Sequence, residues 1–263
     1  MRKYLPLFLG MVLSFLLVGC SQPDTSQESG NENSTEITVA AAASLTDVME
    51  EISEVYQEKN PEVKIAFTFG SSGSLMNQIE EGAPVDVFLS AASKQMDQLE
   101  KKNLIGKDTR KDLLENEIVL IVPKNADKEI SNFEDIATKK VEKIALGDPE
   151  SVPAGQYSKE ILHYLNVEGQ IEDKVVKGTD VRQVLSWVET GEVDCGMVYA
   201  TDAMTSDSVK VVVKAPKGSH KPVVYPAALI QGSKNLEESQ KFLEFLSTKE
   251  AREIFEKYGF QSF

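Results

Sequence analysis

The sequence predicts an α/β fold of two lobes around a ligand cleft, each lobe a mostly parallel sheet flanked by helices. Three observations lead to this prediction. From Ile37 onward, short apolar strand patterns alternate with helical patterns, as in sheets that helices cover. Two such series follow one another and are joined by extended segments. Turns of small residues and serines, at 40–44 and 70–74, stand where a strand pattern becomes helical, which is where such sheets bind ligands.

The first series starts with a strand over 37–43, and Ser44 is the expected N-cap of the helix that follows, with Asp47 three residues later. Apolar residues then recur at helical spacing through Tyr56. The later elements are expected in this order: a strand over 63–69, a helix from the second turn to about residue 81, a strand over 85–89 and a helix over 93–101.

The second series begins with a strongly apolar strand over 117–122. Its other expected elements are helices over 133–139, 154–165 and 180–189 and strands over 143–146, 174–176 and 193–199. The tail adds strands over 209–213 and 223–230 and helices over 236–247 and 249–258, which we expect to return to the first lobe. The predicted division is therefore 36–120 plus 221–263 for lobe I and 121–220 for lobe II.

The N-terminal residues are typical of a targeting segment and are excluded from the fold. Arg2 and Lys3 precede an apolar run over 5–18 that ends at Gly19-Cys20, and this pattern resembles a bacterial lipoprotein signal. The resemblance implies a signal peptide over 1–19 and lipid attachment to Cys20; a plain signal peptide or an uncleaved anchor are the alternatives. Residues 20–35 are predicted to be a flexible tether, because 21–35 contain no aliphatic or aromatic side chain.

The amino-acid composition excludes some classes of binding partner. The chain carries 28 Lys and Arg against 42 Asp and Glu, a formal net charge of −14, which argues against nucleic acid and against electrostatic adhesion to anionic lipid. With Cys20 lipidated, Cys195 has no cysteine left to pair with, and its apolar surroundings predict a buried core residue. Neither His163 nor His220 has a Cys or carboxylate partner at metal-ligand spacing, so no direct metal-ion ligand and no cofactor are expected.

The two serine-bearing turns suggest an anion site built from neutral donors. A helix N-terminus offers unpaired backbone N–H groups, and Ser44 and Ser72 add hydroxyls. Neither turn carries Lys, Arg or His, and the spacing and lysine of a phosphate-binding loop are missing. On the residues alone, Ser44 as a simple N-cap and a Gly/Ser turn around Ser72 that only closes the chain remain open.

Several segments between Ile37 and Phe260 resemble the molybdate-binding proteins of ABC importers. They are AAASLT at 41–46, GAPVDVF at 82–88, GDPESVPAG at 147–155, DVR at 180–182, VYATDA at 198–203, YP at 225–226 and YGF at 258–260. The resemblance implies a periplasmic-binding-protein fold of type II with a hinge between the lobes.

The same resemblance implies which groups hold the anion. Ser44 and Ser72 would donate through hydroxyl and backbone N–H, Ala154 and Val181 through backbone N–H, and Tyr199 through its hydroxyl. On the residues alone, Ala154 and Val181 are only the entries of two helices, and Tyr199 is a core tyrosine at the end of a strand.

The function that the resemblance implies is transport without catalysis. A monomeric, lipid-anchored protein on the extracytoplasmic face of the membrane would capture molybdate or tungstate and deliver it to the membrane permease of an ABC importer. A receptor for sulfate or phosphate is the alternative within this class. An extracellular hydrolase using Ser44 or Ser72 is the alternative outside it, although G-x-S-x-G is absent at both serines. A surface adhesin or purely structural lipoprotein is a third hypothesis.

Overall fold

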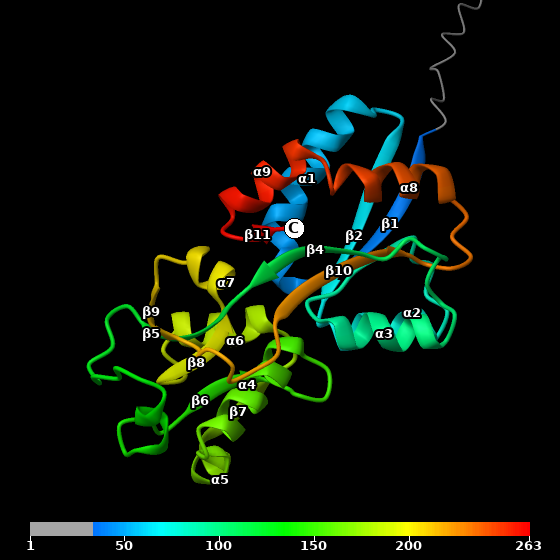
Figure 1. The fold of residues 1–263 in the computed structure, drawn as a ribbon. Helices are drawn as coiled ribbons and strands as arrows, with labels where there is room; N and C mark the ends of the chain where they lie inside the picture. The colour runs from blue at the N-terminus through cyan, green and yellow to red at the C-terminus, as the bar shows by residue number, and fades with distance from the viewer. Residues whose placement is uncertain (1–33) are drawn as a thin grey trace, which may run out of the picture. The chain divides into compact units, whose positions relative to one another are not determined.

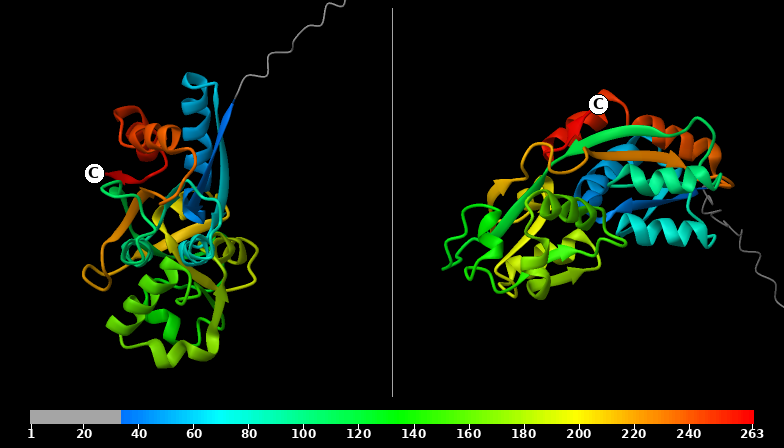
Figure 2. Two further views of the ribbon diagram at one scale, coloured as in Figure 1. Left: turned by 90° about the vertical axis from the view of Figure 1, so that its right-hand side faces the viewer. Right: turned by 60° about the horizontal axis from the view of Figure 1, so that its bottom comes forward.

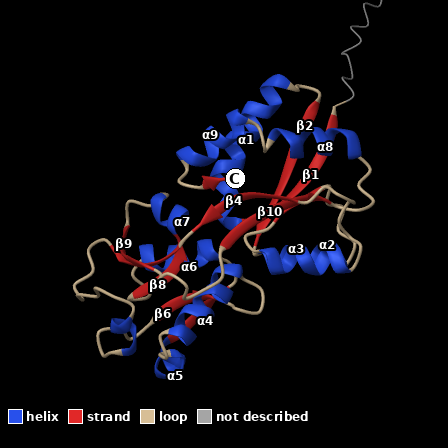
Figure 3. Ribbon diagram, in the orientation of Figure 1, coloured by secondary structure: helices blue, strands red, loops and turns tan. Residues whose placement is uncertain are grey.

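The computed structural model describes residues 34–263, and the predicted signal segment, the lipidation site and nearly all of the tether lie outside these residues. Two mixed sheets flanked by helices make up the fold, which confirms the predicted two-lobed α/β class (Figures 1 and 3). The strand order is β11-β4-β10-β3-β1-β2 in the first sheet and β7-β6-β8-β5-β9 in the second.

The first sheet contains both ends of the described chain. Its strands are β1 (Thr35–Ala42), β2 (Val63–Gly70), β3 (Val87–Leu89), β4 (Lys111–Asn116), β10 (Val223–Leu229) and β11 (Gln261–Ser262). Its helices are η1 (Ala43–Leu45, a 3-10 turn), α1 (Thr46–Lys59), α2 (Ser72–Glu80), α3 (Ser93–Lys101), α8 (Leu236–Phe245) and α9 (Lys249–Lys257). β1 begins one residue inside the predicted tether.

Alternation along β1 explains why this sheet is covered on both faces. Val39 and Ala41 pack in one core cluster with Met49 of α1 and Phe242 of α8. Ala40, which points to the other face, packs in a second cluster with residues of α2 and α3. A strand buried on both faces has to be apolar, as residues 39–43 are.

The second sheet holds the middle of the chain. Its strands are β5 (Ile118–Pro123), β6 (Ile144–Gly147), β7 (Val175–Gly178), β8 (Cys195–Tyr199) and β9 (Val209–Lys214). Its helices are η2 (Glu134–Ala137), α4 (Pro153–Tyr164), α5 (Glu168–Ile171), η3 (Glu172–Lys174), α6 (Val181–Glu189) and α7 (Ala200–Met204). The helix predicted over 133–139 is only the short 3-10 turn η2. Cys195 is buried, as predicted.

The expectation of mostly parallel sheets is wrong. β1 is parallel to β2 and β3, and β6 is parallel to β7 and β8, but β10, β4 and β11 in the first sheet and β5 and β9 in the second pair antiparallel. The chain leaves the first sheet through β4 into β5 and returns through β9 into β10. The outgoing and returning strands lie side by side and therefore run in opposite directions (Figure 2).

Strand β4 was not predicted. Its sequence carries Leu113 and Leu114 side by side, without the alternation that marks a half-buried strand. Strand membership places the first crossing between the sheets at Glu117, within the span 36–120 assigned to lobe I, while the return lies between Lys214 and Val223. The exact division into lobes stays a prediction. Within residues 34–263, no helix combines the length and the apolarity needed to cross a bilayer.

Candidate functional site

A small cavity lies where the two sheets face each other, and all five residues predicted for the site line it. Ser44 and Ser72 contribute from the first sheet, and Ala154, Val181 and Tyr199 from the second. Its volume is about 10 Å³, close to the minimum that a single water molecule needs. None of the remaining lining residues was predicted to be a donor, although all but Ala91 lie in segments named from the sequence: they are Ala42, Ala43, Gly70, Ser71, Ala91, Val152, Pro153 and Asp180.

The parallel pairing of β1 and β2 places the two serine turns next to each other. Ala42 is in register with Gly70 at the carboxyl ends of these strands. Each strand then turns directly into a helical segment, η1 after β1 and α2 after β2. The two segments therefore begin at the same edge of the sheet, where their first N–H groups lack acceptors within the helix.

Ser72 has a hydroxyl whose direction is fixed by the backbone. The side chain is fully buried, and its Oγ accepts a hydrogen bond from the N–H of Ala91 at 2.9 Å. With its oxygen occupied in this way, the hydroxyl proton is left to donate to a group in the cavity. The neighbouring Ser71 has the structural role instead: it is the N-cap of α2, and its Oγ accepts from the N–H of Ser74 at 3.2 Å.

Ser44 is not the N-cap that the sequence predicted. It lies inside the 3-10 turn η1, and α1 begins two residues later at Thr46. An N-cap side chain must precede the first turn to reach the N–H groups there, so a serine within the turn cannot do so. The Ser44 Oγ instead lies 2.9 Å from the hydroxyl oxygen of Tyr225 on β10.

The second sheet presents two helix N-termini to the cavity. α4 starts with Pro153, whose missing N–H costs nothing at this position, and the N–H of Ala154 follows. In α6 the carboxylate of Asp180 accepts from the N–H of Gln183 at 2.9 Å, which leaves the N–H of Val181 without a partner in the cap. Both N-termini bring the positive end of the peptide dipole to the cavity wall.

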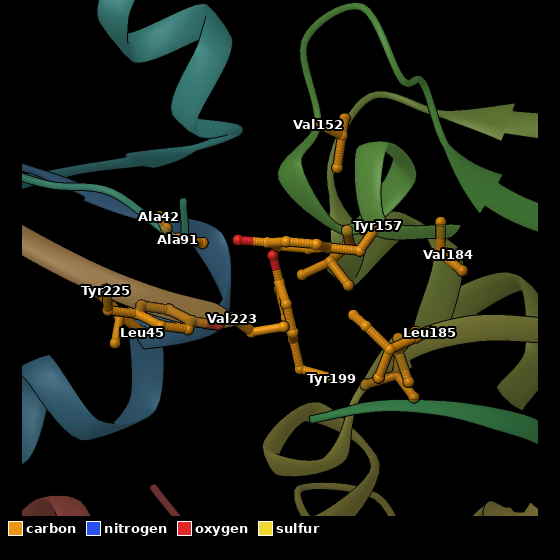
Figure 4. Packing of buried hydrophobic residues seen from close by; sticks show 14 of the residues in the cluster. Ala42, Leu45, Ala91, Val152, Tyr157, Val184, Leu185, Tyr199, Val223 and Tyr225 are labelled. Atoms are coloured by element: carbon orange, nitrogen blue, oxygen red, sulfur yellow. The ribbon is translucent and has the colours of Figure 1, made fainter. Parts of the chain in front are cut away.

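Tyr199, at the end of β8, has a buried hydroxyl with no hydrogen-bond partner among residues 34–263. In Figure 4 the Tyr199 hydroxyl lies beside the side chain of Tyr157, and Tyr199 lines the cavity together with Ala42 and Ala91. Burial raises the pKa of Tyr199 well above its ordinary value, so the hydroxyl keeps its proton at neutral pH. A buried, unpaired O–H costs free energy unless a ligand accepts from it.

The arginine beside the cavity residue Val181 is paired with carboxylates. Arg182 follows Val181, but its guanidinium contacts Asp47 of α1 at 2.5 Å and the buried Asp202 of α7 at 2.9 Å. No Lys, Arg or His of the described chain lines the cavity. Across residues 34–263, no group of three or more His, Cys, Asp or Glu side chains is placed to hold a metal ion. The cavity thus offers hydroxyl and N–H donors in place of counter-charges.

These observations define a class of protein: two α/β lobes with a small, donor-lined cavity between them form a receptor for a small solute. The chain belongs to the family of bacterial extracellular solute-binding proteins, which matches residues 37–261. As a member of that family, the protein is extracytoplasmic.

Three relatives illustrate the match. YvgL of Bacillus subtilis, described as a candidate substrate-binding lipoprotein of an ABC transporter, is 45% identical over 98% of both chains. The molybdate-binding protein ModA of Haemophilus influenzae is 41% identical over 87% of this chain and 91% of its own. The solved substrate-binding domain of a candidate molybdenum ABC transporter from Clostridium difficile is 44% identical, with a TM-score of 0.67 over 87% of this chain and 99% of that domain.

The buried Asp202 gives the protein a predicted pH dependence. Burial raises the pKa of Asp202 to about 6 from an ordinary value of 3.8. The unfolded chain therefore loses this proton at lower pH than the folded chain. The stability that Asp202 contributes is fully present below about pH 4 and is lost as the pH rises through about 6, a change of about 3 kcal/mol.

The measurement is the free energy of unfolding of wild type and Asp202→Asn between about pH 4 and pH 7.5. Relative to the variant, wild type should lose stability over this range. Carboxylates with lowered pKa values, such as Asp135, act in the opposite direction but cancel in the difference. A difference that does not change with pH contradicts the prediction.

Proposed function

We propose that this protein is the lipid-anchored receptor of an ABC importer and that it binds molybdate, and also tungstate, through Ser44, Ser72, Ala154, Val181 and Tyr199. The observation that carries this proposal is the convergence of these five donor residues, from both sheets, on one cavity without a cationic side chain. Molybdate binding is also named for the relative ModA. Molybdate is here a transported ligand and not a cofactor.

The donor set explains the choice among oxyanions. A fully deprotonated dianion offers only acceptors, and each of them can be matched by an N–H or O–H. Hydrogen phosphate would set its own O–H against another donor, which costs about 1–3 kcal/mol for the unpaired group. Sulfate has no such proton but has shorter bonds than molybdate, so fixed donors would lose contact on one side of it. Molybdate and tungstate are nearly equal in size.

Contacts between the lobes support binding by closure. The N–H of Gly73 in α2 donates to the carbonyl oxygen of Ser151 at 2.9 Å, and Arg182 of α6 pairs with Asp47 of α1. A ligand that accepts from both lobes stabilises the arrangement in which these contacts form, because only there do all its donors reach it. The closed pair of lobes would then present one surface to the membrane permease.

The remaining parts of the proposal concern anchoring and chemistry. Lipid on Cys20 and the polar tether would hold a monomer at the extracytoplasmic face of the membrane. We propose no enzymatic activity: the hydroxyl of Ser44 meets Tyr225 and that of Ser72 meets a backbone N–H, so neither serine has a base to activate it. An esterase assay that detects turnover sensitive to Ser72→Ala would favour the hydrolase.

The direct test is thermal unfolding of residues 36–263 with molybdate, tungstate, sulfate or phosphate at equal concentration. A ligand at about 100 times its Kd should stabilise the protein by about 2.7 kcal/mol and raise Tm by about 5–10 °C. We expect this shift with molybdate and tungstate. A shift with sulfate or phosphate alone would replace the proposed ligand, and no shift with any of the four would remove the proposal.

Ser72→Ala is expected to weaken molybdate binding by about 10- to 100-fold, because a hydrogen bond to a charged acceptor contributes about 1.5–3 kcal/mol. Ser71→Ala is the matched control, since Ser71 lines the same cavity but its Oγ accepts a hydrogen bond as the N-cap of α2. It should cost about 1 kcal/mol of stability and leave the affinity nearly unchanged. Isothermal titration of both variants decides, and equal affinities contradict the assignment of Ser72.

A further inference from the structure

A chain of hydrogen bonds starts at the half-buried Asn116 and ends at the cavity residue Ser44. Asn116, the last residue of β4, donates from Nδ2 to the Thr201 hydroxyl at 2.8 Å and to the Tyr225 hydroxyl at 3.3 Å. The Tyr225 hydroxyl in turn lies 2.9 Å from the Ser44 Oγ. Tyr225 and Ser44 are both buried, so water does not compete for the bond between them.

The side-chain orientation of Asn116 determines which group donates in each of these hydrogen bonds. The Asn116 Oδ1 accepts from the N–H of Glu117 at 2.9 Å, which assigns the amide orientation and makes Nδ2 the group that faces the two hydroxyls. An amide nitrogen only donates, so the Tyr225 oxygen is an acceptor in that bond. Its single proton remains, and the Ser44 Oγ is the acceptor within reach. Burial raises the pKa of Tyr225 well above its ordinary value, so this proton is retained.

The same logic then holds for both serines of the cavity. The Ser44 oxygen accepts from Tyr225 as the Ser72 oxygen accepts from the N–H of Ala91. A serine hydroxyl has one proton to donate, and in both cases a group of the protein already donates a hydrogen bond to the serine oxygen. Both hydroxyl protons are thereby left for the cavity.

We propose that Asn116 and Tyr225 are positioning residues that hold the Ser44 hydroxyl as a donor and so determine the preference for fully deprotonated oxyanions. The inference rests on the proposed function, binding of an oxyanion in this cavity. Without the hydrogen bonds from Asn116 and Tyr225, the Ser44 hydroxyl can rotate, donate to a neighbouring group and present a lone pair to the cavity. A protonated oxyanion then finds the acceptor that the wild-type site withholds.

Tyr225→Phe tests this directly. The ring, which packs edge-to-face on Tyr199 and Phe260, stays in place, and only the hydroxyl is lost. We expect the affinity for molybdate to fall relative to that for phosphate by about tenfold, while the ratio of molybdate to tungstate stays unchanged. Titrations or competition at about pH 8, where inorganic phosphate keeps one proton, measure both ratios.

Tyr56→Phe is the matched control. Tyr56 is also buried in the first lobe, between Phe242 and Phe245, and its hydroxyl has no partner among the described residues. Losing that hydroxyl should change neither ratio. Asn116→Ala provides a second variant, which keeps both hydroxyls and removes the donor that sets their direction, together with the bonds of Asn116 to Thr201 and to the N–H of Glu117. It should lower the molybdate-to-phosphate ratio in the same sense as Tyr225→Phe.

A double-mutant cycle separates positioning through Ser44 from a general structural effect. If Tyr225 acts through Ser44, then Tyr225→Phe added to Ser44→Ala should weaken molybdate binding by less than twofold beyond Ser44→Ala alone. Two results would overturn this inference while leaving the proposed function intact. One is that the two substitutions lower the molybdate affinity additively. The other is that Tyr225→Phe and Asn116→Ala leave the molybdate-to-phosphate affinity ratio unchanged although the wild type binds molybdate normally. A wild-type protein that binds neither molybdate nor tungstate overturns the proposed function and this inference with it.

Discussion

Replacing Arg182 with methionine is expected to lower the free energy of unfolding at pH 7.5 by about 3–5 kcal/mol, because it leaves the buried carboxylate of Asp202 without its partner. The Arg182 Nε lies 2.9 Å from an Asp202 oxygen, and the Asp202 side chain is 0% exposed. Urea unfolding measures the change. The loss should shrink at about pH 5, where Asp202, with its pKa raised to about 6, takes up a proton.

The chain offers a close control for this variant. Arg110 also pairs with two carboxylates, Asp97 at 2.7 Å and Glu100 at 2.8 Å, but their side chains are 47% and 56% exposed. Arg110→Met should therefore cost less than about 1 kcal/mol. Adding Asp202→Asn to Arg182→Met should restore most of the lost stability, since no buried charge remains. Equal losses for the two arginines would contradict the role assigned to burial.

Arg182→Met is also expected to weaken ligand binding. The guanidinium joins α6, whose N-terminus carries Val181, to Asp47 on α1, next to the turn that carries Ser44. Removing it leaves the interface between the lobes with one fewer contact in the closed arrangement, so the ligand has to supply more of the closing free energy. The affinity for molybdate at constant pH measures this second effect.

Gly155→Ala is the second substitution for which we expect a large effect. A Cβ at Gly155 would lie 2.0 Å from the carbonyl oxygen of Gly147 and 2.5 Å from its carbonyl carbon, both backbone atoms of β6. α4 must therefore move away from the strand, at a cost of about 3 kcal/mol, near the upper end for overpacked sites. The N–H of Ala154, one residue earlier, moves with it, and molybdate affinity should fall at least about tenfold.

Gly169→Ala is the control within the same lobe. Gly169 lies in α5, and a Cβ there meets no atom within 4 Å. That substitution should be neutral or stabilise the protein by up to about 1 kcal/mol, because alanine restricts the unfolded chain. Thermal unfolding and titration with molybdate are compared for both variants. Wild-type stability and affinity in Gly155→Ala would show that α4 does not depend on close contact with β6.

Part of the site could be predicted from the sequence because its residues leave a pattern. Ser44 and Ser72 stand in turns of small residues between a strand and a helix, and the strand–helix alternation predicts that such turns meet at one sheet edge. Ala154 and Val181 leave almost no pattern, since a backbone N–H has no side-chain signature. They were predicted only from the resemblance to a family. The same is true of Tyr199, which without that resemblance is typical of a core residue.

Other features had no signal in the sequence. Asn116 and Tyr225 are separated by more than a hundred positions and meet only because β4 and β10 are neighbours in the first sheet. Ser44 was expected to cap a helix, and its partner on β10 could not be foreseen. Strand β4 itself was missed, and with it the antiparallel crossing that makes both sheets mixed.

The sequence by itself determined the α/β class, the order of most elements and the small, uncharged turns, because these depend on local periodicity and on residue size. The tertiary structure decided how the groups meet: which strands run antiparallel, which carboxylates receive Arg182 and which hydroxyl faces Ser44. These pairings join residues far apart in the chain, and their free energies depend on burial and on distances of a few ångströms, which exist only once both sheets are in place.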